Sequence, residues 1–450
     1  MRFQTEQEAI TYLFRSRDKG KKRGLDEVSR DVSSTRRLLL RTNLPATKRE
    51  HVVITGSKGK GSTAAITAKV LQHLGHKTGL ITSPHLRTWY ERIRINGEAI
   101  PKVDFLRIAS DLAPDIDAIE ATLTDTQYIS PQGILLLVAL RYFDEQSVTA
   151  AVVEVGRGGR FDDMALVPNK VALFTPIVME HAQYMGDSLE RIAWHKSGII
   201  PHGGFAYSVA QSPDVMTVLQ TEADTRDCEF FWFSSGDTGE FITDTPNGIR
   251  FRLQRYGEVE LSLHGHYQMQ NAALAIQAAG NMHARLQGIA HSSPEYVARV
   301  KAALADVTWF GRVQVMQMQP QVIVDGAINV LSVRSFLKSV ASRVTSPLII
   351  IAGVPSDRDY DAVYKLLAKK ADALILTASN INPGIQFPDK DHALTVARQY
   401  HDTVQYHARL PDALEAASTL SGDSGTVLLS VAQPLVGEAM LLWDVDTSRL

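Results

Sequence analysis

The sequence predicts an α/β protein of two domains, each built around a mostly parallel sheet. Three observations support this prediction: the chain has 450 residues, short apolar runs alternate with helical patterns, and a glycine-rich turn joins one such run to a helix. A chain of this length exceeds what one core usually holds. Alternating strands and helices indicate βαβ units, in which helices cover both faces of a parallel sheet.

The first domain is expected to span residues 1–308. Its alternating elements are strand 52–55 with helix 64–74, helix 134–143 with strand 150–155, and strand 171–175 with helix 188–199. Between 203 and 262 the pattern changes to short segments with turn signals and an alternating run at 249–253, which predicts a small antiparallel annex. A pair of helices, 268–286 and 294–304, closes the domain.

The second domain is expected to span residues 309–450. Four strands are predicted at 322–325, 348–352, 373–377 and 426–430, and four helices at 330–340, 360–370, 408–420 and 436–442. This order predicts a smaller, Rossmann-like α/β domain. Its length of about 140 residues is typical of a domain.

Composition and charge favour an ordinary soluble protein. The chain has 44% hydrophobic and 21% charged residues, and a net charge of -2 gives no electrostatic reason for a nucleic-acid or membrane partner. The local basic run Lys19–Arg23 is compatible with a small anionic ligand. Cys228 is the single cysteine, which excludes an intrachain disulfide. The N-terminus lacks the apolar core of a signal peptide, so we expect a cytoplasmic protein. We also expect it to be a monomer.

The segment 51–63 contains the most informative motif, an apolar strand that runs into glycines, a lysine and two hydroxyl residues. Such a turn offers backbone N–H groups and a helix N-terminus to phosphate, while Lys60 adds a positive charge and Ser62 or Thr63 an oxygen for Mg²⁺. We therefore expect ATP to bind; the alternatives are a simple turn and a dinucleotide site. The predicted nucleotide-binding residues are Gly56, Ser57, Gly59, Lys60, Gly61, Ser62 and Thr63.

A carboxylate follows another predicted strand. Glu154 ends the run Ala150–Glu154 and precedes a glycine-rich turn that continues to Asp162. Oxygen ligands of this kind suit a hard cation. A solvated strand-end glutamate is the alternative, and Asp162 could cap or brace the turn.

These two motifs, G-x-x-G-K-G-S-T and E-V-G-x-G-G-R-x-D, resemble those of the folylpolyglutamate and dihydrofolate synthases, a family of Mur-type amide ligases. The resemblance extends from residue 6 to residue 440. It implies a ligase that uses ATP and two Mg²⁺ ions to activate an acceptor carboxylate as an acyl phosphate, which the amine of an amino acid then attacks. Its implied substrates are a small carboxylic acid, of folate or pteroate type, and glutamate.

The same resemblance assigns roles to two further segments. By position, His181 would support the second Mg²⁺ and Lys196 would be carbamylated. The loop Thr82–Leu86 would lie at the acceptor site, with Ser83 as a metal ligand and with Pro84, His85 and Arg92 at the acceptor. By sequence alone, a structural or exposed histidine is the favoured interpretation of His181, and an ordinary turn with a hairpin through Asn96-Gly97 is the favoured interpretation of the loop.

Three segments resemble the family's contacts with the remainder of the nucleotide. They are Gly265–Asn271, Trp309–Arg312 and Val324–Asn329. The resemblance implies that Asn271, Arg312 and Asp325 contact the nucleotide, with Arg312 stabilising charge on the phosphates. An exposed Arg–Asp pair is the alternative. The implied catalytic residues are Lys60, Glu154, His181, Lys196 and Arg312, and the implied metal ligands are Ser62, Ser83, Glu154 and His181.

The chain departs from the family pattern at several positions. They are Ile328 and Tyr267 in place of histidines, Val431-Ala432 in place of Gly-Ser, Pro131-Gln132 in place of an aromatic-glutamate pair, and Glu180 in place of aspartate. Because the phosphate loop and metal ligands are retained, we expect an active ligase. The alternatives are a paralogue that joins a different amino acid or acid, and an ATP-binding module without catalysis.

Overall fold

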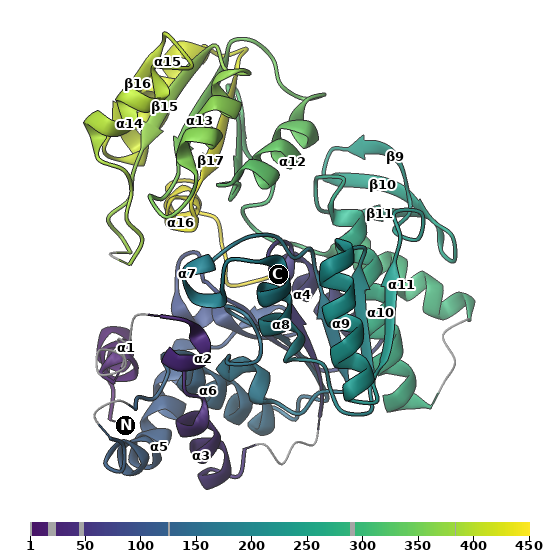
Figure 1. The fold of residues 1–450 in the computed structure, drawn as a ribbon. Coiled ribbons are helices and arrows are strands. Elements are labelled where there is room, and N and C mark those ends of the chain that lie inside the picture. The colour runs from purple at the N-terminus through teal and green to yellow at the C-terminus, as the bar shows by residue number, and fades with distance from the viewer. Residues whose placement is uncertain (1, 17–23, 45–48, 125–126, 289–292, 383) are drawn as a thin grey trace.

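A computed structural model describes residues 2–16, 24–44, 49–124, 127–288, 293–382 and 384–450. The basic run 19–23 lies outside these residues. Figure 1 shows a larger N-terminal part and a smaller C-terminal part, each with a sheet between layers of helices.

Within the described residues, the largest sheet has eight strands in the order β4-β3-β2-β5-β1-β6-β7-β8. Strands β2, β5, β1, β6, β7 and β8 are parallel, and β3 and β4 form an antiparallel hairpin at one edge. The strands are β1 Glu50–Thr55, β2 Thr78–Ile81, β3 Ile93–Ile95, β4 Glu98–Ala99, β5 Ala150–Glu154, β6 Val171–Phe174, β7 Phe205–Val209 and β8 Glu229–Phe233.

Helices cover both faces of this sheet, as the alternation of apolar residues requires (Figure 1). Val53 and Val153 pack under one group of helices, whereas Ile54 and Val152 pack under the other. The first group is α1 Glu6–Phe14, α3 Ser33–Arg41, α5 Lys102–Glu120, α6 Pro131–Glu145, α8 Leu189–Ser197 and α9 Pro213–Thr225. The second group is α4 Lys60–His73, α10 Gln268–Gln287 and α11 Pro294–Asp306.

The antiparallel annex is smaller than the sequence predicts. It consists of β9 Glu240–Thr245, β10 Gly248–Leu253 and β11 Gly257–Leu261, which form a separate antiparallel sheet. The prediction that the annex begins near 203 is wrong, because β7, α9 and β8 form one more parallel unit of the large sheet. Strand β8 lies at the sheet edge and leaves Phe231 and Trp232 exposed, so it lacks the buried apolar pattern of an internal parallel strand.

The second α/β part has a sheet of its own. Its order is β12-β13-β17-β14-β15-β16, with β12 antiparallel to β13 and the other pairs parallel. The strands are β12 Gln314–Met318, β13 Gln321–Asp325, β14 Leu348–Gly353, β15 Ala373–Thr377, β16 Val404–His407 and β17 Thr426–Val431. Helices α12 Val330–Val340, α13 Tyr360–Ala368 and α14 Lys390–Ala397 cover one face, and α15 Leu410–Ser421 and α16 Gln433–Leu442 cover the other.

This architecture confirms the predicted fold class. Most predicted helices and strands are present, and α12 and β15 have the predicted bounds. A boundary between residues 308 and 309 stays a prediction, and so does a cytoplasmic location. Among the described residues, no helix combines the length and the apolar character that a membrane span requires.

The buried face of α12 gives a test of the second core. Phe336 is 1% exposed, whereas Leu331 of the same helix is 48% exposed. Truncation of Phe336 to alanine leaves a cavity, so we expect Phe336→Ala to lower the free energy of unfolding by about 3–5 kcal/mol in urea denaturation. Leu331→Ala is the control and should change it by about 0.5 kcal/mol or less. Equal effects of both variants would contradict this packing.

Candidate active site

The turn between β1 and α4 has the geometry of a phosphate-binding loop. Gly56 and Gly59 have φ angles of 144° and 87°, which favour glycine. A β-carbon at Gly56 would lie 1.9 Å from Oγ1 of Thr175, and one at Gly59 would lie 2.6 Å from Oδ1 of Asn271. Asn271 of α10 therefore borders the loop, and its contact with the nucleotide stays a prediction. The side chain of Ser57 braces the loop by accepting the N–H of Val178 at 3.1 Å.

Helix α4 begins at Lys60, four residues before the predicted start at Ala64. The reason is that Gly59, in the left-handed conformation, is the N-cap residue and no side chain caps the helix. The N–H groups of the first turn have no partner within a helix and can bind an anion. Ser62 and Thr63 lie in this turn, and Oγ1 of Thr63 is buried without a hydrogen-bond partner among the described residues.

Two lysines converge on the loop. Nζ of Lys60 and Nζ of Lys196 donate to the carbonyl oxygen of Gly56 at 3.0 and 2.8 Å. Lys196, on α8, is 1% exposed and also donates to Oε1 of Glu180 at 3.3 Å. Burial lowers the pKa of Lys196 to about 8, although Glu180 favours its charged form. Burial alone would raise the pKa of Glu180, but Lys196, Lys60 and Lys58 lower it to about 2.

Glu154 ends β5 beside the loop and contacts the predicted acceptor loop. It is 4% exposed, and its Oε2 accepts the backbone N–H of Ser83 at 3.0 Å. Burial raises its pKa, whereas Lys60, this N–H group, Arg312 and Arg92 favour the carboxylate. The solvated strand-end alternative for Glu154 is therefore wrong.

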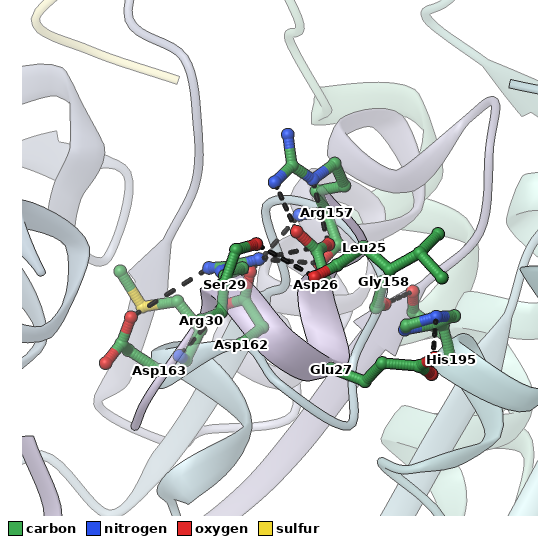
Figure 2. Close-up of polar contacts among 12 residues, drawn as sticks. Leu25, Asp26, Glu27, Ser29, Arg30, Arg157, Gly158, Asp162, Asp163 and His195 are labelled. Atoms are coloured by element: carbon green, nitrogen blue, oxygen red, sulfur yellow. Dashed lines mark hydrogen bonds and ion pairs between the residues drawn. The ribbon is translucent and has the colours of Figure 1, made fainter. Parts of the chain in front are cut away.

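The turn after Glu154 is held by ion pairs to α2 Asp26–Ser29, as Figure 2 shows. Arg157 binds both carboxylate oxygens of Asp26, at 2.5 and 3.0 Å. Asp162 accepts the backbone N–H of Arg157 at 3.2 Å and pairs with Arg30 at 3.1 Å. Asp162 thus braces the turn, which is one of the two roles expected for it.

His181 follows Glu180, the carboxylate that pairs with Lys196. It precedes the short helix α7 Ala182–Met185 and has φ of 51°. Burial lowers its pKa to about 4, so its imidazole is neutral at pH 7 and retains a lone pair for a ligand. Among the described residues, no hydrogen bond or ion pair joins His181 to Glu154 or Ser83.

The acceptor loop contains a histidine–arginine pair. Nε of Arg92 donates to Nδ1 of His85 at 2.9 Å, and its guanidinium lies 4.1 Å from the centre of the Trp89 ring. Burial and Arg92 lower the pKa of His85 to about 3, so its ring is neutral. Because Nδ1 accepts, the ring hydrogen is on Nε2. The predicted hairpin follows, with Asn96 and Gly97 at positive φ between β3 and β4.

Trp309–Arg312 connects the two α/β parts at the edge of the phosphate loop. A β-carbon at Gly61 would lie 2.6 Å from the Trp309 ring. Arg312 interacts electrostatically with Glu154 and with Asp325. Asp325 is 5% exposed and accepts the N–H of Val313 at 2.9 Å, and burial raises its pKa to about 6. The alternative of an exposed Arg–Asp pair is therefore wrong for Asp325.

A cavity between the two parts brings some of these groups together, whereas Lys60, His181, Lys196, Asn271 and Asp325 do not line it. It is lined by Gly61, Ser83, Pro84, Glu154, Trp309, Arg312, Ile328 and Gln433, among others. Residues from the phosphate loop, the acceptor loop and both sheets therefore face one space. Ile328, which stands where the family pattern has a histidine, lines this cavity. One departure from that pattern therefore lies at the site itself.

The structure also adds Lys58 and Arg358 to the site. Lys58 pairs with Glu180 at 3.7 Å, and burial lowers its pKa to about 8. Arg358, between β14 and α13, interacts electrostatically with Lys58 and His181. Its position after the carboxyl end of a parallel strand is the signal that could have indicated it. Among the described residues, no three acidic, histidine or cysteine side chains cluster as a metal site.

Comparisons with known proteins identify the family. A model described as the Mur ligase middle domain matches residues 54–279, and one described as Mur ligase, glutamate ligase domain, matches residues 311–432. A dihydrofolate synthase/folylpolyglutamate synthase of Bacillus subtilis is 30% identical over 349 residues, which are 75% of this chain and 79% of the relative. The chain belongs to the folylpolyglutamate synthase family of Mur ligases.

Other members of this family agree. A dihydrofolate synthase/folylpolyglutamate synthase of Mycobacterium tuberculosis is 28% identical over 425 residues, which are 88% of this chain and 84% of that protein. A solved Mycobacterium tuberculosis folylpolyglutamate synthase complexed with ADP has a TM-score of 0.84 at 25% identity and covers 98% of this chain and 100% of its own. Membership confirms the resemblance and the predicted enzyme class, an ATP-dependent ligase.

The close approach of Gly59 to Asn271 gives a test of the phosphate loop. Gly59→Ala combines a strained φ with a clash at 2.6 Å, so we expect it to weaken ATP binding at least tenfold in calorimetric titration. Gly288→Ala is the matched control, since Gly288 has φ of 67° but no atom within 4 Å of its β-carbon. Unchanged ATP affinity in Gly59→Ala would contradict the assigned loop.

Proposed function

We propose that this ligase joins glutamate to a folate or pteroate-type carboxylic acid, at the expense of ATP. One observation carries the proposal: the backbone of Ser83 binds Glu154 at 3.0 Å, which fixes the acceptor loop beside the phosphate loop. Carboxylate acceptor and triphosphate would then meet in the cavity that Arg312 also lines. The relatives named for folylpolyglutamate and dihydrofolate synthesis support the choice of substrates.

In this reaction, an oxygen of the acceptor carboxylate attacks the γ-phosphorus of ATP and ADP leaves. The amine of glutamate then attacks the acyl carbon of the acyl phosphate, phosphate leaves, and the nitrogen loses a proton. We assign the phosphates to the backbone of Gly56–Thr63 and to Lys60 and Arg312, whose charges stabilise the transferring group. Asn271 and Asp325 are assigned to the remainder of the nucleotide, and Pro84, His85 and Arg92 to the acceptor.

The residues present fit the two Mg²⁺ ions that the family implies. Ser62, Ser83 and Glu154 offer oxygen ligands, and the orphaned hydroxyl of Thr63 adds a buried oxygen in the same helical turn. His181 and the acid beside it, Glu180, would hold the second ion. Bound Mg²⁺ supplies charge neutralisation on the phosphates. The bond between Ser83 and Glu154 holds two of these ligands together, and Glu180 is held by its bond to Lys196.

Ile328 favours one alternative substrate assignment. The family has a histidine at this position, and here an apolar side chain lines the cavity between the domains. A pocket that exchanges a hydrogen-bonding group for an apolar one favours a different ligand at that point. The second candidate is therefore a ligase of the same chemistry that uses another amino acid or acid. A non-catalytic ATP-binding module would leave the buried Glu154 and Lys196 without a use.

A phosphate-release assay that crosses carboxylic acids with amino acids tests the proposal. We expect release of ADP and phosphate to require Mg²⁺, glutamate and a folate or pteroate-type acid together, with mass measurement of the amide. Lys60→Ala and Glu154→Ala should each lower turnover at least a hundredfold, because the first removes a positive charge at the transferring phosphate and the second removes an oxygen ligand assigned to Mg²⁺. Arg449→Ala is the control, because the side chain of Arg449 is 73% exposed. Turnover of another acid alone would establish the second candidate.

Lys196 gives a prediction that does not depend on turnover. Its lowered pKa of about 8 leaves part of the side chain as a free amine, which can attack the carbon of CO₂ and lose a proton to give a carbamate. The carbamate places a second negative charge beside Glu180, so we expect formation of the carbamate to require Mg²⁺. Labelled bicarbonate should give a carbamate carbon signal in NMR that grows as the pH rises through about 8. Lys196→Arg should lack the signal; an identical signal in that variant would assign it elsewhere.

A further inference from the structure

Residues 443–450, here called the strap, run from α16 of the C-terminal part back to the N-terminal part. In Figure 1 this yellow segment ends beside α4. The N–H of Ala99 donates to the carbonyl of Ser448 at 2.8 Å, and the N–H of Leu450 donates to the carbonyl of Gly97 at 3.1 Å. The strap therefore lies along the β3–β4 hairpin that follows the acceptor loop.

A buried arginine holds the strap on the hairpin. Arg94 is 3% exposed, and its guanidinium donates to the carbonyl oxygens of Thr447, Ser448 and Gly97 at 2.6, 2.7 and 3.0 Å. Burial lowers its pKa to about 10, so it remains a cation at neutral pH. A planar cation with several donors suits this clustering of carbonyl groups.

One carboxylate joins the strap to the acceptor loop. Glu91 is 5% exposed and accepts the backbone N–H groups of Leu86, Arg87 and Thr88 at 2.9, 2.8 and 2.7 Å. It also accepts the hydroxyl of Thr447 at 2.8 Å. Hydrogen bonds to a charged acceptor are stronger than neutral ones, so Glu91 fixes the backbone of 86–88 relative to the strap.

The acceptor loop is thus enclosed by the C-terminal part on two sides. Nε2 of Gln433, in α16, donates to the carbonyl of His85, and a β-carbon at Gly437 would lie 2.2 Å from the carbonyl of Leu86. Glu91 and Arg94 line the same cavity as Glu154. The loop that carries the predicted acceptor residues is therefore positioned by groups that belong to both parts.

We propose that Glu91, Arg94 and Thr447 are positioning residues of the ligase, and that the strap sets the geometry of the acceptor loop. The kinetic part of this inference rests on the proposed function, because it requires an acid that the enzyme converts. The structural part does not, because it concerns the backbone of 86–88 alone. A strap that served only general stability would instead change nucleotide binding and folding together with acceptor binding.

Thr447→Val tests the inference with a small change of shape. Loss of a hydrogen bond to a charged group corresponds to about 1.5–3 kcal/mol, or roughly tenfold to a hundredfold. We expect the KM for the acceptor acid to rise at least tenfold, with kcat and the affinity for ATP changed less than twofold. Thr447→Ser retains the hydroxyl and should restore the KM. Arg449→Ala, which removes an exposed ion pair to Glu98, is the matched control in the strap.

Hydrogen exchange gives a second measurement that needs no substrate. In Thr447→Val, the amides of 86–88 should exchange at least tenfold faster than in the wild-type protein, and those of β13 should be unchanged. If the phosphate-release assay finds no acid that the enzyme converts, the proposed function fails. The exchange comparison still shows whether the strap positions the backbone of 86–88. Unchanged exchange at 86–88, or an equal rise in exchange across the whole chain, would overturn the inference.

Discussion

Two ammonium groups share one carbonyl oxygen, that of Gly56, and the arrangement of the site depends on this contact. Lys60 belongs to the loop itself, whereas Lys196 comes from α8, which packs on the opposite face of the sheet from α4. Positive charges held so close together repel, and burial makes the repulsion stronger. The carboxylates of Glu180 and Glu154 offset it. Phosphate brings negative charge to the same place, so ligand binding relieves a repulsion already present in the protein.

The second constraint is that the site lies between two parts of the chain. Gly61 packs against Trp309, the acceptor loop packs against α16, and Arg312 extends from the connection toward Glu154. Groups on both sides must approach each other for a carboxylate, a triphosphate and an amine to react in one enclosed space. The close contacts of glycine residues show how little room remains at these points. A single extra methyl group would separate surfaces that the reaction requires to be in contact.

Much of this was predictable from the sequence, because the relevant patterns are local. The glycine spacing before Lys60, the apolar strand ending at Glu154 and the strand–helix alternation are each read within a few residues. Other features depend on distant contacts. The start of α4 is set by Gly59, which Asn271 approaches too closely for a β-carbon, and β8 joins the large sheet despite its exposed aromatic residues. Thr447 and Glu91 are 356 residues apart, so no local pattern could connect them.

The chain crosses between its two parts twice, once near Trp309 and once in the strap. In the order of the chain, the second α/β part is therefore an insertion within the first. A single proteolytic cut near Trp309 would not release it, because the strap would still hold it to the hairpin. During synthesis, the carboxylate of Glu91, which binds the backbone of 86–88, can acquire its full set of partners only after Thr447 has left the ribosome. The acceptor loop is thus one of the last regions of the N-terminal part to be completed, although it is translated early.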